Sequence, residues 1–210
     1  MTVAGLIRRG GIAAVAVGLL LGCASVPAAA LERNPADAKA LASQPIEQLH
    51  YDPAAKCVGK AQPGARALEK WLGRHWAGVP WGIYRCERWG RGSASVHSEG
   101  RAVDWHLDAG VGRQKRAATR LIEMLLAADR ECNEAALARR MGVQGIIFNC
   151  RQWFGHGDSL EPYGYCFDRR GRRRHHLSRT EAHMDHVHIE LNWAGARKRT
   201  SFWHSPLAPH

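Results

Sequence analysis

Two short stretches of the chain carry residue types that bind metal ions and move protons. The first contains His97 and Asp104, and the second contains Asp185, His186 and His188. Together they supply a His–Asp–His set and a spare carboxylate three residues before the last histidine. A catalytic zinc site needs three such protein ligands, an open position for water, and a carboxylate to take a proton from that water. The residue types therefore predict one zinc site assembled from both stretches.

Strand geometry bears on how the second stretch presents its side chains. Side chains alternate along a strand, so His186 and His188 lie on one face. By the same alternation Asp185 faces away from His188, and it reaches the metal site only if the strand begins irregularly. In the first stretch Gly100 allows a sharp backbone bend, and the small Ala102 leaves room beside the metal.

Both stretches also resemble the motifs of a known family. Residues 95–104 match in full the SxHxxGxAxD motif of the zinc D-Ala-D-Ala carboxypeptidases and dipeptidases, and residues 185–188 resemble the second motif of that family. The family is related to the L-alanyl-D-glutamate endopeptidases, the lysostaphin-type enzymes and the hedgehog domain. The resemblance implies three zinc ligands, His97, Asp104 and His188.

The resemblance also implies roles for three further residues. Asp185 corresponds to the general base, and His186 to a residue that supports the ligands or stabilises the transition state. Arg85 follows a Gly-x-Tyr sequence, as a substrate-binding arginine does in many of these enzymes. We therefore expect an exported zinc metallopeptidase that hydrolyses the stem peptides of peptidoglycan.

Which bond is cleaved stays open, because the chain lacks the Glu-x-Trp-His form of the carboxypeptidase branch. Both D,D-carboxypeptidase and endopeptidase activity fit. One alternative is a non-catalytic, zinc-stabilised wall-binding module, for which the hedgehog relatives are a precedent. Another is a basic wall-binding protein without a metal. Retention of Asp185 favours the enzyme.

The N-terminal residues predict export. Arg8 and Arg9 precede an apolar run over residues 10–22, which is shorter than the roughly 20 residues needed to span a bilayer. This pattern is typical of a secretory signal peptide. Two processing sites compete: a lipobox that ends at residue 22 and would leave a lipid on Cys23, and a small-residue site that ends at residue 30. A membrane contact is expected only through that lipid.

The charge balance fits an envelope protein. The formal charge of +11 falls to +9 when Arg8 and Arg9 leave with the signal. A basic exported protein suits anionic wall polymers, and export argues against nucleic acid as a partner. The arginines of residues 169–174 either grip such a polymer or form a solvated loop. Trp153 and Trp193 are candidates for lining a glycan groove.

Five cysteines remain after the signal. Export permits disulfides, and an odd count leaves one thiol over. Sequence does not fix the connectivity. We favour the pairs Cys57–Cys86 and Cys150–Cys166, with Cys132 free.

Periodicity predicts an α+β domain with a small, mostly antiparallel sheet, helices packed on one face and the zinc site on the sheet. Residues 31–62 read as a tether with one short helix, and residues 63–210 as the metallopeptidase-like domain. Expected helices begin at residue 63 and cover residues 113–128 and 133–141. Expected strands cover residues 81–86, 102–107, 143–149 and 185–191, with loops over residues 87–95 and 151–184.

Two histidines close to the motifs have no ligand spacing. We expect His106 to be packed in the core or to contact the metal ligands without binding the metal itself. We expect His183 to face solvent.

Overall fold

The computed structural model describes residues 40–41, 43–155, 157 and 159–209. The signal peptide and Cys23 lie outside these residues. None of the helices within them is long and apolar enough to cross a membrane.

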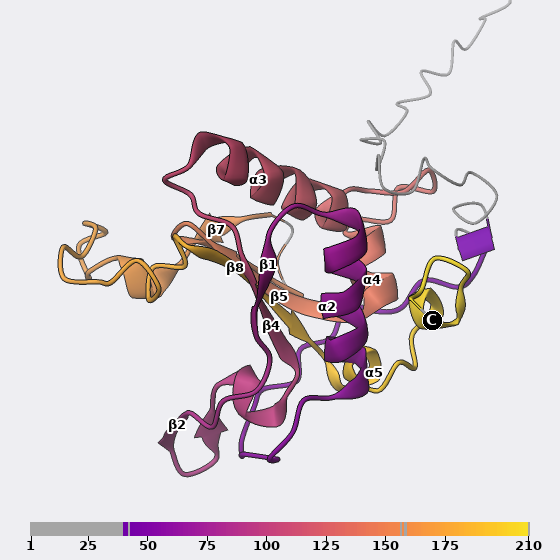
Figure 1. Cartoon of the computed structure of the whole chain (residues 1–210), viewed down its shortest axis with the longest axis horizontal. Helices are drawn as coiled ribbons and strands as arrows, with labels where there is room; N and C mark the ends of the chain where they lie inside the picture. Colours follow the sequence, from indigo (N-terminus) through magenta and orange to yellow (C-terminus); the bar gives the residue numbers. More distant parts are fainter. Residues whose placement is uncertain (1–39, 42, 156, 158, 210) are drawn as a thin grey trace, which may run out of the picture.

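A six-stranded antiparallel sheet forms the centre of the molecule (Figure 1). Its strands lie in the order β1-β4-β8-β5-β6-β7, and each strand is antiparallel to its neighbours. The bounds are β1 Val79–Gly82, β4 Ala102–His106, β5 Val143–Phe148, β6 Arg151–Phe154, β7 Glu161–Pro162 and β8 His186–Leu191. Strands β4 and β8, which carry the two motifs, are direct neighbours, with Asp104 opposite His188. This adjacency is what joins the two motifs.

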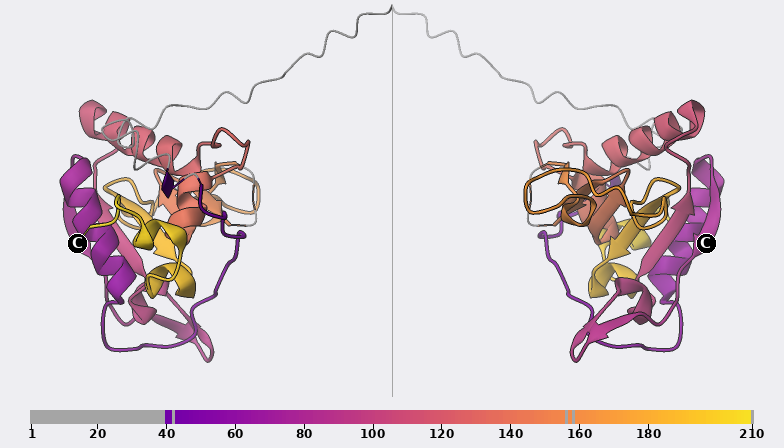
Figure 2. Two further views of the ribbon diagram at one scale, coloured as in Figure 1. Left: turned by 90° about the vertical axis from the view of Figure 1, so that its right-hand side faces the viewer. Right: turned by 90° about the vertical axis from the view of Figure 1, so that its left-hand side faces the viewer.

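Three helices cover one face of the sheet (Figures 1 and 2). Helix α2, Pro63–His75, starts with a proline in its first turn and buries Leu68, Trp71 and Leu72 at helical spacing. Helix α3, Gly112–Leu126, and helix α4, Ala136–Met141, contribute further apolar side chains to the same core. The predicted α+β fold with helices on one face is confirmed.

The core lies between these helices and alternate residues of the strands. Val103 and Trp105 of β4, and Val187 and Ile189 of β8, are fully buried in it. The residues between them point to the opposite face, so the two histidines of β8 lie away from the helices. The fold thus separates an apolar face from a face that carries the chemistry.

Both edges of the sheet are short strands that contain a proline. At one edge lies β1, with Pro80, and at the other lies β7, with Pro162. Strand β1 pairs with β4 through an irregular register between Pro80 and Gly82.

The segment before α2 packs against the domain where the structure describes it. The amide of Asp52 donates to Gln144, and the Asp52 carboxylate accepts from the amide of Trp193. The amide of Val58 donates to the carbonyl of Ser98, 2.8 Å away. Figure 2 shows this segment crossing the side of the molecule away from α2. Part of the expected tether therefore helps to cover the site-bearing face.

Two expected elements have different bounds in the structure. The strand expected at residues 81–86 is β1 at Val79–Gly82, because after Gly82 the chain leaves the sheet to reach the first motif. The helix expected at residues 133–141 is α4 at Ala136–Met141. Asn133 does not cap it, because its side chain binds the carboxylate of Asp129 instead.

Both expected loops contain strands. The loop at residues 87–95 includes a small hairpin of β2, Arg88–Gly90, and β3, Ser93–Ala94. The long loop after residue 150 begins with β6, which pairs with β5 across a tight turn. That turn places Asn149 and Cys150 at φ 49° and 58°. Such positive φ angles are typical of two-residue hairpin turns, but a glycine usually occupies at least one of the two positions, and here the chain has none.

The disulfides Cys57–Cys86 and Cys150–Cys166 are both present, as the sequence analysis favoured. The prediction of a free thiol at Cys132 is wrong, because this cysteine is also disulfide-bonded. Disulfides are typical of proteins that fold in an oxidising, exported environment.

Candidate metal centre

A short 3-10 helix, η1 (Val96–Glu99), delivers His97 to the site. The Ser95 hydroxyl accepts from the amide of His97, which caps this turn. Gly100 ends it at φ 66°, and a Cβ there would lie 2.0 Å from the carbonyl oxygen of Lys60. Only glycine fits both the backbone angle and the contact. The bend places His97 beside β4 and explains the glycine of the first motif.

Three side-chain atoms converge where β4 meets β8. Nε2 of His97 lies 3.1 Å from Oδ1 of Asp104 and 3.1 Å from Nδ1 of His188. Nδ1 of His188 lies 2.9 Å from the same carboxylate oxygen. Ligand atoms of a tetrahedral zinc ion stand about 3.3–3.4 Å apart. All three residues are buried, and their donor atoms are grouped as metal ligands are.

The remaining nitrogen of each histidine has its own partner. Nδ1 of His97 donates to the carbonyl of Ile83, 2.8 Å away, and Nε2 of His188 donates to the carboxylate of Glu190, 3.1 Å away. Gln144 binds the other carboxylate oxygen of Glu190. Such outer partners fix the tautomer, so that the inward nitrogen keeps its lone pair for a metal.

Glu190 was missed in the sequence, although strand alternation from His186 and His188 places residue 190 on the same face. It is buried, and burial raises the pKa of its carboxyl. The hydrogen bond from His188 opposes that effect, and the pKa falls below its usual value. Glu190 is therefore a carboxylate that holds His188 in place.

Asp104 determines the charge of the cluster formed by His97, Asp104 and His188. Burial raises the pKa of Asp104, but hydrogen bonds from His188 and His97 outweigh it and hold the pKa far below its usual range. Burial lowers the pKa of His188, but its contacts with Asp104 and Glu190 raise it to about 9. Without an ion, the cluster thus keeps a proton on His188 at neutral pH.

Arg85 lies at the mouth of this cluster. Its Nη1 donates to Oδ2 of Asp104 at 2.6 Å, and its Nε donates to Glu87 at 2.6 Å. About half of its side chain is exposed, so the guanidinium faces both the cluster and solvent. Arg88 and Arg91, the rival arginines, are exposed on the β2–β3 hairpin and make no contact with the cluster.

The carboxylate of Asp185 contacts His186 and not the donor atoms of His97, Asp104 and His188. One carboxylate oxygen accepts from Nδ1 of His186 at 2.8 Å, and the other accepts from the Thr180 hydroxyl at 2.7 Å. Burial raises the pKa of Asp185, but these hydrogen bonds outweigh it and lower the pKa. The orientation agrees with the strand alternation, which turns Asp185 away from His188.

His186 presents its second nitrogen to the cluster. Nε2 of His186 lies 3.5 Å from Oδ1 of Asp104, is buried and has no hydrogen-bond partner among the described residues. Burial lowers the pKa of His186, which keeps the ring neutral at physiological pH. A neutral imidazole held through Nδ1 by a carboxylate is arranged to accept a proton at Nε2.

The expectation that His183 faces solvent is wrong. Its ring lies 4.7 Å from that of His186 and 5.4 Å from that of His188, between centroids. Burial, with the neighbouring histidines, lowers the pKa of His183 to about 2. His106 is partly buried and contacts the ring of Trp81, in keeping with a packed role.

The tryptophans named as groove candidates do not line an open groove. Trp153 is 2% exposed and its indole donates to the carbonyl of Gly157. The guanidinium groups of Arg101 and Arg197 each lie over the ring of Trp193. Trp81, which was not singled out, is half exposed and contacts the ring of His186.

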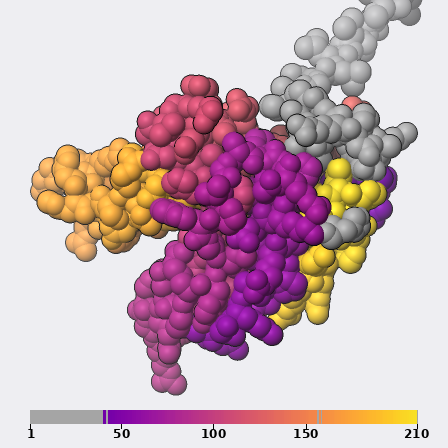
Figure 3. Space-filling view, viewed as in Figure 1, coloured from indigo at the N-terminus to yellow at the C-terminus, as the bar shows by residue number. Residues whose placement is uncertain are grey.

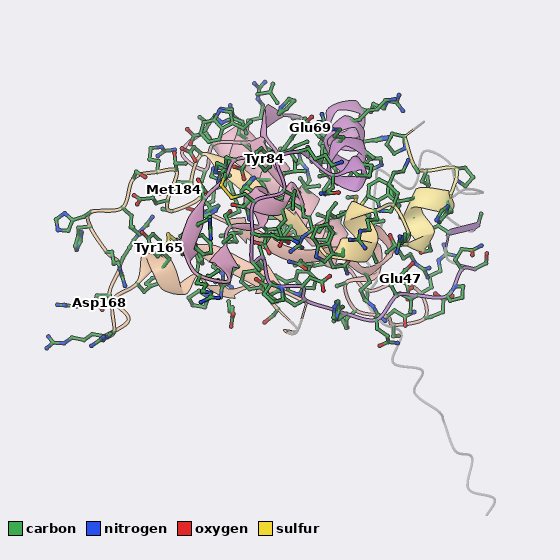
Figure 4. The ribbon with its side chains drawn as sticks, turned by 90° about the horizontal axis from the view of Figure 1, so that it is seen from below. Glu47, Glu69, Tyr84, Tyr165, Asp168 and Met184 are labelled. Atoms are coloured by element: carbon green, nitrogen blue, oxygen red, sulfur yellow. A yellow bond between two sulfur atoms is a disulfide. The ribbon has the colours of Figure 1, made fainter. Side chains whose placement is uncertain are left out.

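An arm beside the site carries the arginine run. We call residues 164–182 the arginine arm; it projects from the body in Figure 3, and Figure 4 shows Tyr165 and Asp168 on it. The disulfide Cys150–Cys166 attaches its base to the sheet. A cavity of about 620 Å³ on the arm is lined by Arg172, Arg173, Arg174 and neighbouring residues, and by none of the converging ligands.

The fold and site define an α+β domain with a buried histidine–carboxylate set suited to a metal ion. A family model described as VldE, C-terminal domain, matches residues 57–177, more than half of the chain, and the chain belongs to this family. The match includes Arg85, His97 and Asp104 and ends before β8. No curated protein and no solved structure matches the chain.

Proposed function

We propose that the protein is an exported zinc metallopeptidase that hydrolyses peptide bonds in the stem peptides of peptidoglycan. One observation carries the proposal: the donor atoms of His97, Asp104 and His188 lie 2.9–3.1 Å apart. Beside them lie a guanidinium and a carboxylate-held imidazole, groups that can stabilise an oxyanion and accept a proton during amide hydrolysis.

The residues present fit a zinc ion. Two neutral nitrogens and one carboxylate oxygen are a common zinc donor set, and three protein ligands leave a fourth position free. The outward nitrogens of both histidines are already bonded to protein, as expected of ligands. When bound, zinc would supply a Lewis acid for the amide carbonyl and lower the pKa of a nearby water.

The other steps fall to side chains of this chain. We propose that Nε2 of His186 accepts the proton from the attacking water and returns it to the leaving amine. Asp185 would hold the ring in the required tautomer through Nδ1, 2.8 Å away. This refines the expectation from the sequence, in which Asp185 itself takes the proton. Arg85 would bind a substrate carboxylate or the developing oxyanion through two parallel hydrogen bonds.

The setting of the site supports a substrate in the cell wall. The net charge is positive, and five arginines lie within residues 169–174, which suits contact with anionic wall polymers.

The decisive experiment is a digest of purified peptidoglycan. Zinc-loaded protein should release new amino groups, and mass analysis of the fragments should identify the bond. Chelator-treated protein and the His188→Ala variant are the matched controls and should release none. Absence of amine release by protein that carries a full equivalent of zinc would contradict the proposal.

A second candidate function is a non-catalytic, zinc-stabilised wall-binding module. It is favoured by the position of Asp185, whose carboxylate contacts Thr180 and His186 instead of the metal ligands. In the same digest such a module would bind zinc and sediment with peptidoglycan without releasing amines. A metal-free wall-binding protein would sediment equally well after chelation and carry no zinc.

A further inference from the structure

Nδ1 of His183 and Nε2 of His186 are buried near the metal centre and have no hydrogen-bond partner among the described residues. Nδ1 of His106, opposite His186 on β4, is a third such atom, but His106 belongs to neither group of possible metal ligands. Leaving a buried polar atom unpaired costs roughly 1–3 kcal/mol, so each such atom calls for an explanation. The rings of His183 and His186 are neighbours, with centroids 4.7 Å apart, so a single explanation can account for both unpaired nitrogens. Both nitrogens can act as donors to a metal ion.

The backbone holds His183 in place over the site. Its φ of 48° lies in the left-handed region, which is uncommon for a residue other than glycine. The amide of His183 donates to the carbonyl of Thr180 at 3.0 Å, and its carbonyl accepts from the amide of Asn149 at 2.7 Å. Strained residues fixed on both sides in this way are often found at functional sites.

We propose that His183, His186 and His188 form a second metal seat, which we call the histidine seat. One donor atom from each residue lies within 4.8 Å of the other two. His188 contributes Nδ1, because its Nε2 donates to Glu190. That same Nδ1 also belongs to the set with His97 and Asp104. The two seats therefore share an atom and hold one ion at a time.

The donor chemistry separates the two seats. The histidine seat offers three imidazole nitrogens and no carboxylate, whereas the first set includes the anionic Asp104. Imidazole donors suit copper, nickel and zinc, and affinity rises from nickel to copper in the usual order. The histidine seat should thus accept Ni²⁺ or Cu²⁺ when the carboxylate of the first set is lost. This inference concerns metal binding and does not depend on peptidase activity.

The test is a titration of purified protein with Ni²⁺, followed by calorimetry and by metal analysis after desalting. Asp104→Asn removes the anionic donor of the first set, and this variant should still bind one equivalent of Ni²⁺. Adding His183→Ala should weaken that binding by more than about tenfold. The matched control adds His175→Ala, an exposed histidine of the arginine arm, and should leave the affinity unchanged.

Two results would overturn the histidine seat. One is an Asp104→Asn protein that binds no Ni²⁺; the other is an unchanged affinity when His183→Ala is added. If Asp104→Asn fails to fold, Asp104→Ser or Asp104→Ala, which also remove the carboxylate, provide the same background. The wild-type protein should bind one equivalent of metal in total, and two tightly bound equivalents would show that the seats do not share His188. Peptide release plays no part in these readouts, so failure here is distinct from failure of the proposed activity.

Discussion

The two faces of strand β8 place different demands on the sequence. Val187 and Ile189 point into the core below the helices, where they contribute apolar area among many similar neighbours. His186 and His188 point the other way, and each makes contacts that only an imidazole can make. Both faces are buried, so burial alone does not distinguish them.

The difference lies in what a substitution removes. In the core, a smaller apolar side chain costs stability in proportion to the volume lost, and the fold survives. On the site face, each side chain has a particular atom at a particular distance from Asp104. A change of one atom there removes a particular contact of the site, whatever volume it keeps.

The largest contrast should come from neighbouring residues of β8. His188→Ala should abolish stoichiometric zinc, because it removes the ligand that links β4 to β8. Ile189→Val should keep a full equivalent of zinc and lower the free energy of unfolding by about 0.5–1.5 kcal/mol. Metal analysis and chemical denaturation measure the two effects. Full zinc in His188→Ala would show that the ligand assignment is wrong.

Asp185→Asn should separate metal binding from turnover. The amide keeps the shape of the side chain but loses the negative charge that orients His186 and stabilises its protonated form. Zinc should stay at one equivalent while peptide release falls by roughly 10²–10⁴-fold. The single-turnover rate and the metal content, measured on one preparation, test this. Turnover near that of the wild type would mean that neither Asp185 nor its hold on His186 matters.

Arg85→Lys tests whether the exposed guanidinium beside Asp104 binds the substrate. Lysine keeps the charge near Asp104 but cannot form two parallel hydrogen bonds, so most activity should be lost with zinc and fold unchanged. The matched control is Arg88→Lys on the exposed β2–β3 hairpin, which should have little effect. The reverse pattern, in which Arg88 is essential and Arg85 dispensable, would refute the assignment.

Glu190→Gln should have a smaller effect, which should be confined to the affinity of the site for zinc. The amide still accepts from Nε2 of His188 but lacks the charge that orients the ring and raises its basicity. Zinc affinity should fall by about 10–100-fold, as measured by competition with a chelator. An unchanged affinity would show that Glu190 has only a packing role.

The last effect, which needs the metal to be absent, should be a pH dependence of stability in metal-free protein. The pKa of His188 is about 9 in the fold, above its ordinary value of 6.5, because of Asp104 and Glu190. The stabilisation from its proton is therefore complete below pH 6.5 and lost as the pH rises through 9. Denaturation of chelated protein at pH 6.5 and 9.5 should show this loss. Chelated His188→Ala protein is the control and should not show it.

The sequence predicted the site face better than its surroundings. Alternation along β8 predicts that His186 and His188 share a face and that Asp185 faces away from His188, and the structure has this arrangement. His97 and Asp104 of the first motif lie beside His188, and their role as zinc ligands, like that of Asp185 as the base, stays a prediction. Side-chain period in a strand is a local property, so it can be read from one segment alone. The α+β fold followed from the apolar patterns of the helices and buried strands.

What the sequence did not predict depends on turns and distant contacts. His183 lies outside any periodic element, and its position is set by a left-handed backbone angle and a hydrogen bond from Asn149. Strand β6 was missed because the turn before it uses Asn149 and Cys150 instead of glycine. The position of His183 leaves no local pattern, since it depends on a contact with Asn149, far away in the chain. The β5–β6 hairpin is local, but its turn lacks the glycine that usually marks one.

The prolines at the two sheet edges affect how copies of the protein meet. An exposed edge strand can pair with the edge of another molecule and so begin an aggregate. Proline has no amide hydrogen to donate, and here one lies in each outer strand, Pro80 in β1 and Pro162 in β7. Neither edge offers an unbroken row of donors to a neighbouring copy. Each edge is thus a poorer template for edge-to-edge pairing than an unbroken strand would be.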